Sequence, residues 1–211
     1  MLKRRIGMSV IGVTVCAVSV GIFKIAALGV DPFQSLMSGL NQFIPISFGT
    51  LYVIVNALLL IFSIFADRTN IGIATFVNLF LLGYITEFSY AFLQKVIVNP
   101  NMLIRLICLA LGIVIMCIGS AFYMTAKLGV STYDAIAIVL SEKWKLGKFK
   151  YIRIMTDLTC IVLGIVFFLL GKGQIGAIPT IVGIGTVVTA FFMGPLIQYF
   201  NEKLAIPFLN R

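Results

Sequence analysis

The chain has 211 residues, of which 61% are hydrophobic and only 11% are charged. Soluble domains are about 45–50% apolar and about 25% charged, so this composition excludes an ordinary soluble globular protein. The formal net charge is +9, but the basic residues lie mainly near the termini and in connecting segments, which excludes a nucleic-acid-binding face as its cause. We therefore predict an all-α polytopic membrane protein.

Six apolar segments are each about as long as a bilayer-spanning helix, which needs about 20 residues. They cover residues 6–23, 48–66, 71–92, 103–125, 154–170 and 175–200. The first follows Lys3, Arg4 and Arg5 and so resembles a signal peptide, but it is longer than a typical signal sequence and further spans follow it. We expect an uncleaved first helix and a single transmembrane domain over residues 1–211.

Two shorter helices are predicted between the long ones, at residues 31–44 and 131–141. Asp31 followed by a proline is typical of a helix N-cap, and Ser131 with Asp134 three residues later resembles a capping box. At 1.5 Å per residue these helices rise only about 21 and 16 Å, whereas the hydrocarbon core of a bilayer is about 30 Å thick.

The short helices decide the topology. If they do not cross the membrane, the chain has six crossings in two inverted groups of three. If they do cross, the alternative is eight spans in two parallel groups of four. We favour the inverted 3+3 arrangement. Both arrangements place three segments on the cytoplasmic side, because basic residues are concentrated there. These segments are the N-terminus, the 142–153 connection and the C-terminus.

Two short motifs recur in the second half of the chain. They pair LGVDPFQS (28–35) with LGVSTYDA (128–135), and ATFVN (74–78) with GTVVT (185–189). We interpret this recurrence as an internal duplication, with repeat 1 at residues 1–100 and repeat 2 at residues 101–211. Duplicated membrane bundles often place a small-molecule site at the interface of their repeats.

Few residues are suited to catalysis. The sequence contains no histidine, which removes Ser-His and Cys-His mechanisms and His-ligated metal sites. Its cysteines lie in apolar segments without a C-x-x-C pair, and we interpret them as small buried hydrophobic residues: Cys16, Cys108, Cys117 and Cys160. We expect no enzymatic activity, no cofactor and no bound metal.

Polar residues in the short helices and the long spans are the candidate substrate-binding residues. Polar groups inside a membrane are costly and usually face a partner or water. The candidates are Asp31, Gln34, Ser38, Asn78, Ser131, Asp134 and Thr189. Structural alternatives stay open for all of them: an amphipathic helix lying at the interface for the first short helix, helix capping for Asp134, and helix–helix hydrogen bonds for Asn78 and Thr189.

Three further residues are candidates for ion coupling. Glu87 is the one carboxylate inside a long predicted helix and well away from a connection, so it is a candidate protonatable group. Arg153 and Asp157 are four residues apart at the start of another span, and they are candidates for the same role. The structural alternative is an ion pair that neutralises itself where it enters the membrane.

The order of motifs resembles the YczE/YitT-like family of small bacterial integral membrane proteins. The resemblance rests on Leu-Gly at 28–29 and 128–129, on Arg153 with Asp157, and on the G-x-G-T…G-P-x-x-Q pattern over 183–198. Gln34 stands where the family's first turn usually has an acid, and Ser131 with the threonine after it replaces the Pro-Arg of the second turn. The resemblance implies a multi-pass protein of the bacterial inner membrane and is compatible with a transporter.

The leading functional hypothesis is a small-solute transporter or permease. It would work by alternating access, with the two repeats moving around a midplane site that includes Asp31, Gln34, Asn78, Asp134 and Thr189. The alternative is a non-transporting scaffold or regulatory subunit that docks through the basic 142–153 connection. The expected partners are the lipid bilayer and a small-molecule solute, with a second copy or a partner subunit as a further option, and no nucleic acid.

Overall fold

Helices form the regular secondary structure of residues 2–210, the part of the chain that this computed structural model describes. They are α1 Leu2–Ala26, α2 Pro32–Phe43, α3 Phe48–Ala66, α4 Ile73–Val96, α5 Met102–Thr125, α6 Thr132–Ile138, α7 Phe149–Leu170, α8 Ile184–Phe200 and α9 Ile206–Asn210. π-helical turns follow α6 at Val139–Lys143 and α8 at Asn201–Ala205, and a 3₁₀ helix, Ile175–Thr180, precedes α8. The predicted all-α class is confirmed.

Six helical segments are long and apolar enough to cross a membrane. They are Leu2–Ala26, Phe48–Ala66, Ile73–Val96, Met102–Thr125, Tyr151–Leu170 and Ile175–Leu209. The α2 and α6 helices are not among them, because 12 and 7 residues rise only about 18 and 10 Å. Six long helices plus two short ones are therefore the arrangement that the sequence analysis favoured.

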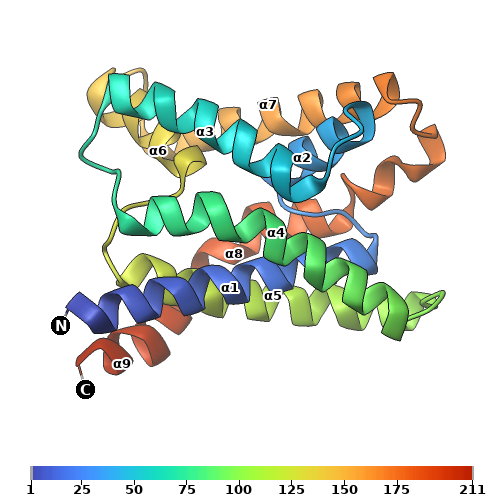
Figure 1. Cartoon of the computed structure of the whole chain (residues 1–211), viewed down its shortest axis with the longest axis horizontal. Coiled ribbons are helices and arrows are strands. Elements are labelled where there is room, and N and C mark those ends of the chain that lie inside the picture. Colours follow the sequence, from blue (N-terminus) through green and yellow to red (C-terminus); the bar gives the residue numbers. More distant parts are fainter. Residues whose placement is uncertain (1, 211) are drawn as a thin grey trace.

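The helices lie in two layers (Figure 1). One layer holds α1, α4, α5 and α8, and the other holds α2, α3, α6 and α7. Within the layers α1 packs on α4 and α5, and α2 packs on α7, so each layer combines helices from the first and second halves of the chain. The two sequence halves are therefore interleaved and do not form separate bundles.

Both described ends of the chain lie at the same end of the bundle (Figure 1). The α3–α4 connection lies there too, and the Lys143 ammonium donates a hydrogen bond to the Ala66 carbonyl from the π-helical turn after α6. From this end α4 runs to the opposite one, where the α4–α5 connection lies. Residue 68 thus lies at the same end as the termini and residue 99 at the opposite one, which is the order that six crossings require and eight do not.

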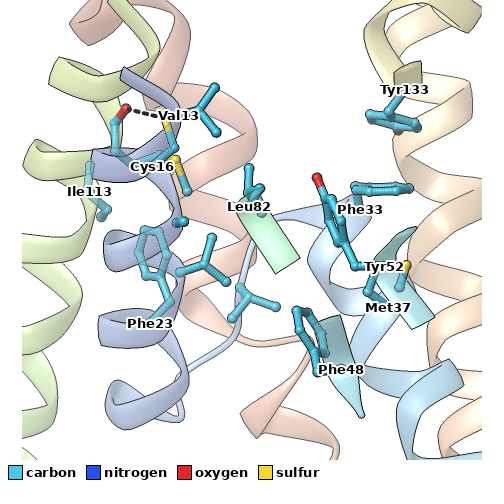
Figure 2. Close-up of a cluster of buried hydrophobic side chains, with 14 of the residues drawn as sticks. Val13, Cys16, Phe23, Phe33, Met37, Phe48, Tyr52, Leu82, Ile113 and Tyr133 are labelled. Atoms are coloured by element: carbon cyan, nitrogen blue, oxygen red, sulfur yellow. Dashed lines mark hydrogen bonds between the residues drawn. The ribbon is translucent and has the colours of Figure 1, made fainter. Parts of the chain in front are cut away.

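Backbone contact through glycine holds neighbouring helices together. A Cβ atom added to Gly12 of α1 would lie 2.6 Å from the backbone nitrogen of Tyr123 in α5. A Cβ added to Gly39 of α2 would lie 2.0 Å from the carbonyl oxygen of Gly164 in α7. Close packing of this kind is how membrane helices associate, since lipid provides no hydrophobic driving force between them. The space between the layers is filled by buried apolar side chains (Figure 2).

Each recurring Leu-Gly-Val turn docks on the start of a helix from the other half of the chain. In the first turn the Val30 N–H donates to the Ile181 carbonyl (3.3 Å), and the Leu28 carbonyl accepts from the Gly185 N–H (2.7 Å). The second turn does the same at the start of α4. There the Val130 N–H donates to the Asn70 carbonyl (3.0 Å), and the Leu128 carbonyl accepts from the Ala74 N–H (2.9 Å).

Glycine is required at the centre of both turns. Gly29 has a φ of +95° and Gly129 a φ of +109°, a region that other L-residues rarely adopt. The space is also closed, since a Cβ on Gly29 would lie 2.4 Å from the Gly183 nitrogen and one on Gly129 would lie 2.5 Å from the Gly72 nitrogen. These turns lead the chain directly into α2 and α6.

Candidate functional site

A charged cluster lies between α6 and α7. The Arg153 guanidinium contacts the Asp134 carboxylate through Nη1, and its Nε lies 3.4 Å from Oδ1 of Asp157. The Tyr133 hydroxyl donates a hydrogen bond to the same Asp157 oxygen at 2.6 Å. Arg153 also lies over the Tyr133 ring, 4.5 Å from its centroid. One cation is thus shared by two carboxylates and an aromatic face.

Local helix geometry sets the position of Asp134. The Ser131 hydroxyl accepts from the Asp134 N–H at 3.0 Å and donates to its Oδ2 at 2.7 Å, so the predicted cap is present. This cap uses one carboxylate oxygen of Asp134, and Arg153 binds the other. Asp134 therefore has a capping role and an ion-pairing role together.

The cluster lies in the first two turns of the candidate spanning segment of α7, Tyr151–Leu170. Arg153 and Asp157 lie four and eight residues beyond the first residue of that helix, or about 6 and 12 Å along its axis. The side chains of Arg153 and Asp134 remain 33% and 38% exposed. The protein therefore encloses these two charged side chains only in part.

A neutral version of this arrangement lies on α3. Tyr52 and Asn56 have the same spacing as Arg153 and Asp157, displaced by 101 residues. The Tyr52 hydroxyl donates to Oδ1 of Asn78 at 3.2 Å, and the Asn56 carboxamide oxygen accepts from the Thr132 hydroxyl. All these donors and acceptors are uncharged, in contrast to the charged groups on α6 and α7.

An aromatic stack connects the charged and neutral sides. The Phe33 and Tyr133 rings lie 4.9 Å apart between centroids and are inclined by 20°, and Tyr52 meets the edge of Phe33 at 5.9 Å (Figure 2). Phe33 and Tyr133 are the second residues of α2 and α6. The first turns of the two short helices therefore meet where the polar groups converge.

The polar residues of α2 serve different roles. Oδ1 of Asp31 accepts from the Gln34 N–H at 3.1 Å as the predicted N-cap, and Asp31 lies within electrostatic range of Arg153 and Asp157. Gln34 is 4% exposed, and its carboxamide oxygen has no hydrogen-bond partner in the structure. Ser38 is half-buried on a helix that packs closely on α7. The α2 helix is thus packed inside the bundle and does not lie on the membrane surface.

The remaining candidates lie apart from the cluster. The Thr189 hydroxyl donates to the Thr186 carbonyl of its own helix at 3.0 Å. Glu87 lies nine residues beyond Asn78 on α4, about 13 Å further along the axis, and accepts a hydrogen bond from the Gly49 N–H at 3.0 Å. Glu87 therefore caps the start of α3, and its coupling role stays a prediction.

Sequence reasoning missed the aromatic residues of the site. Phe33 and Tyr133 occupy the same place in the two recurring motifs, and the equal spacing of Tyr52–Asn56 and Arg153–Asp157 was a second available signal. A search for charged residues finds Arg153 and Asp157, but it passes over the aromatic residues to which these two signals point. Within residues 2–210, no group of three carboxylate or thiol side chains is placed to hold a metal ion.

The fold and this site define a class: a polytopic helical membrane protein with a charged cluster between a short helix, α6, and a long one, α7. A family model described as "Family of unknown function (DUF6198)" matches residues 3–202, and the chain belongs to this family.

Two relatives come from Bacillus subtilis (strain 168). The uncharacterized protein YyaS is 24% identical over 201 residues, covering 95% of this chain and 94% of the relative. The uncharacterized membrane protein YczE is 28% identical over 186 residues, covering 87% of this chain and 78% of the relative. An uncharacterized protein of Haemophilus influenzae is 23% identical over 204 residues, covering 96% of this chain and 85% of the relative. The resemblance to YczE-like proteins is thereby confirmed. No solved structure matches the chain.

Proposed function

We propose that the protein is a small-solute transporter that works by alternating access. The observation that carries this proposal is the Asp134–Arg153–Asp157 cluster, which lies at the start of the candidate spanning segment of α7 and beside the contact between the short helices α2 and α6. Transporters commonly bind substrate and coupling ions where broken helices meet near the midplane. Charged groups cost more free energy inside a membrane than neutral ones. Neutral pairs such as Tyr52 with Asn78 already hold helices together here, so a purely structural role does not account for the charges.

The composition of the cluster favours a proton or a cation as the coupling ion. Asp134 and Asp157 are two carboxylates that share one guanidinium, and Asp31 adds a third carboxylate nearby. When ionised, the cluster therefore carries excess negative charge, which an incoming proton or monovalent cation would reduce. We propose no catalytic role for these residues, because the sequence offers no nucleophile–base pair to accompany them.

The layers suggest which parts would move. Since each layer contains helices of both sequence halves, the moving units in this proposal are the α1–α4–α5–α8 layer and the α2–α3–α6–α7 layer. The matched docking of the two Leu-Gly-Val turns supports an inverted internal repeat. The basic residues at the end that carries the termini support a cytoplasmic location for that end, in a bacterial inner membrane.

Cysteine labelling from each side of the membrane tests the proposal. On a cysteine-free background, Cys replaces Asp134 or Gln34, and an impermeant maleimide is added to right-side-out or to inside-out vesicles. Alternating access predicts labelling at these positions from both sides, with competition by a transported solute. The matched control is Leu58→Cys, because Leu58 is 61% exposed near the middle of α3 and would face lipid. If positions 34 and 134 stay as unreactive as position 58, the proposal is wrong.

A scaffold role is the second candidate, and the α6–α7 connection favours it. Trp144 and Leu146 are 50% and 65% exposed there, interspersed with Lys143, Lys145 and Lys148. A basic and apolar surface of this kind suits an acidic partner. This candidate predicts that charge reversal of the three lysines abolishes function while Asp134→Asn is tolerated, and the transporter proposal predicts the opposite.

A further inference from the structure

Two pockets lie at opposite ends of the bundle, away from the charged cluster. One has a volume of about 300 Å³ and is lined by Arg5, Lys127, Thr125 and Asn201 with apolar neighbours. The other has a volume of about 400 Å³ and is lined by Lys24, Arg105, Tyr90, Gln94 and Asn99 with apolar neighbours. The first lies at the end that carries both termini, and the second lies beside the α4–α5 connection.

Each pocket contains one arginine and one lysine, and neither has a carboxylate among its lining residues. The Nε atoms of Arg5 and Arg105 are buried and have no hydrogen-bond partner in the structure. A buried, unpaired donor on a cation loses the hydrogen bonds that water would supply, so it is costly unless a ligand accepts from it. Both pockets therefore carry positive charge, and each is lined by an arginine that has one buried, unpaired nitrogen.

The two arginines occupy equivalent places in the fold. Arg5 is the fourth residue of α1, and Arg105 is the fourth residue of α5, the helix that packs most extensively on α1. The two residues are 100 positions apart, the same displacement as the recurring turns. The same unpaired group thus appears at both ends, at positions related by the displacement of the recurring turns.

Carboxylates near the pockets have other partners. Glu87 lies within electrostatic range of Lys24, but it caps α3 through the Gly49 N–H. Glu202 accepts a hydrogen bond from the Gln198 side chain. The Lys24 ammonium lies 3.3 Å from the centroid of the Phe48 ring and so already has a partner. The Arg105 guanidinium is therefore the main donor of the second pocket.

We infer that each pocket binds a phosphate group, supplied by an anionic lipid headgroup or by free inorganic phosphate. Arginine and lysine together are the usual donors to phosphate oxygens, and charge-assisted hydrogen bonds to them are about twice as strong as neutral ones. The pockets lie at the two ends of the spanning helices, the depth at which lipid phosphates are found. The inference does not depend on transport, so it stands or falls separately from the proposed function.

The test uses the full chain purified in detergent. The probes are dioctanoyl phosphatidylglycerol, inorganic phosphate, and dioctanoylglycerol, which has the same acyl chains without phosphate. Binding is followed by the dissociation constant and, for the lipid, by the number of bound molecules in native mass spectrometry. Binding of the phospholipid alone identifies headgroup sites, and binding of free phosphate as well identifies solute sites.

Substitutions assign the binding to the two pockets. Arg5→Gln and Arg105→Gln each remove one charged donor, and we expect each to lose one bound phospholipid and to weaken its site by about tenfold or more. Lys3→Gln and Lys95→Gln are the matched controls, because these lysines are exposed at the same two ends without lining a pocket. Arg5→Lys and Arg105→Lys, which keep the charge, should retain part of the binding and show that the variants fold. Equal binding of dioctanoylglycerol, or an Arg5→Gln/Arg105→Gln double variant that binds like the wild type, would overturn the inference.

Discussion

Phe33 and Tyr133 stack on each other at the centre of the bundle, with ring centroids 4.9 Å apart. They are 100 residues apart in the chain and occupy the same position in the two recurring turn motifs. Each follows the first residue of a half-length helix, and each of these helices is placed by a turn that docks on the other half of the chain. The stack therefore joins the two halves at the point where the charged cluster begins.

Tyr133 contributes to the site through both its ring and its hydroxyl, and two substitutions separate these contributions. Tyr133→Phe keeps the stack but removes the hydrogen bond to Asp157, and we expect it to cost about 1.5–3 kcal/mol of stability. Phe33→Ala removes the stack and leaves a cavity, with an expected cost of about 3–5 kcal/mol. Thermal unfolding in detergent measures both. If Tyr133→Phe destabilised the protein more than Phe33→Ala, the ring stack would not be the main contact.

Arg153 pairs with two carboxylates. The stability lost when Arg153 is replaced should therefore be partly regained when one of these carboxylates is also replaced. Arg153→Gln leaves Asp134 and Asp157 without their cation. Breaking a fully buried pair costs about 3–5 kcal/mol, and we expect about 1–3 kcal/mol here because these side chains are partly exposed. At about 2–4 °C of melting temperature per kcal/mol, the loss is measurable by thermal unfolding. The double variant Arg153→Gln/Asp134→Asn should recover part of it, and simple additivity of the two losses would contradict a direct interaction.

The two turn glycines should tolerate no side chain. Gly29→Ala and Gly129→Ala each place a Cβ at positive φ and against a glycine nitrogen, so we expect a loss of at least about 1–2 kcal/mol from the backbone conformation alone, with the clash adding to it. Gly7→Ala is the control, because no other atom lies within 4 Å of an added Cβ there. In a helix that change should be neutral or stabilise by about 0.5–1 kcal/mol. Similar melting temperatures for all three variants would show that the turns are not rigidly docked.

Positions 68 and 99 report the topology directly. In the six-crossing arrangement α4 separates them, so Arg68→Cys and Asn99→Cys should react with an impermeant maleimide from opposite sides of the membrane. Arg68→Cys should react from the same side as Lys145→Cys, because Lys143 contacts the end of α3. Reaction of Arg68→Cys from the side opposite to Lys145→Cys would indicate eight crossings.

Much of the fold was readable from local sequence. The lengths of the apolar segments predicted six spanning helices, since a helix must match the bilayer thickness. Asp31 and Ser131 predicted where the two short helices begin, because an N-cap needs only residues within one turn of the chain. The self-neutralising pair of Arg153 with Asp157 was also predictable, since residues four apart share a helix face.

The tertiary structure decided what these local signals left open. No local pattern indicates that Arg153 also binds Asp134, which lies 19 residues away on another helix, or that Phe33 meets Tyr133. Nor does it indicate that the layers mix the two sequence halves. Those pairings depend on which helix backbones can approach each other closely. Glycines such as Gly39 and Gly164 allow a close approach only when the two helices that carry them face each other. Sequence by itself determined the helices and their caps, and packing between distant segments determined the site.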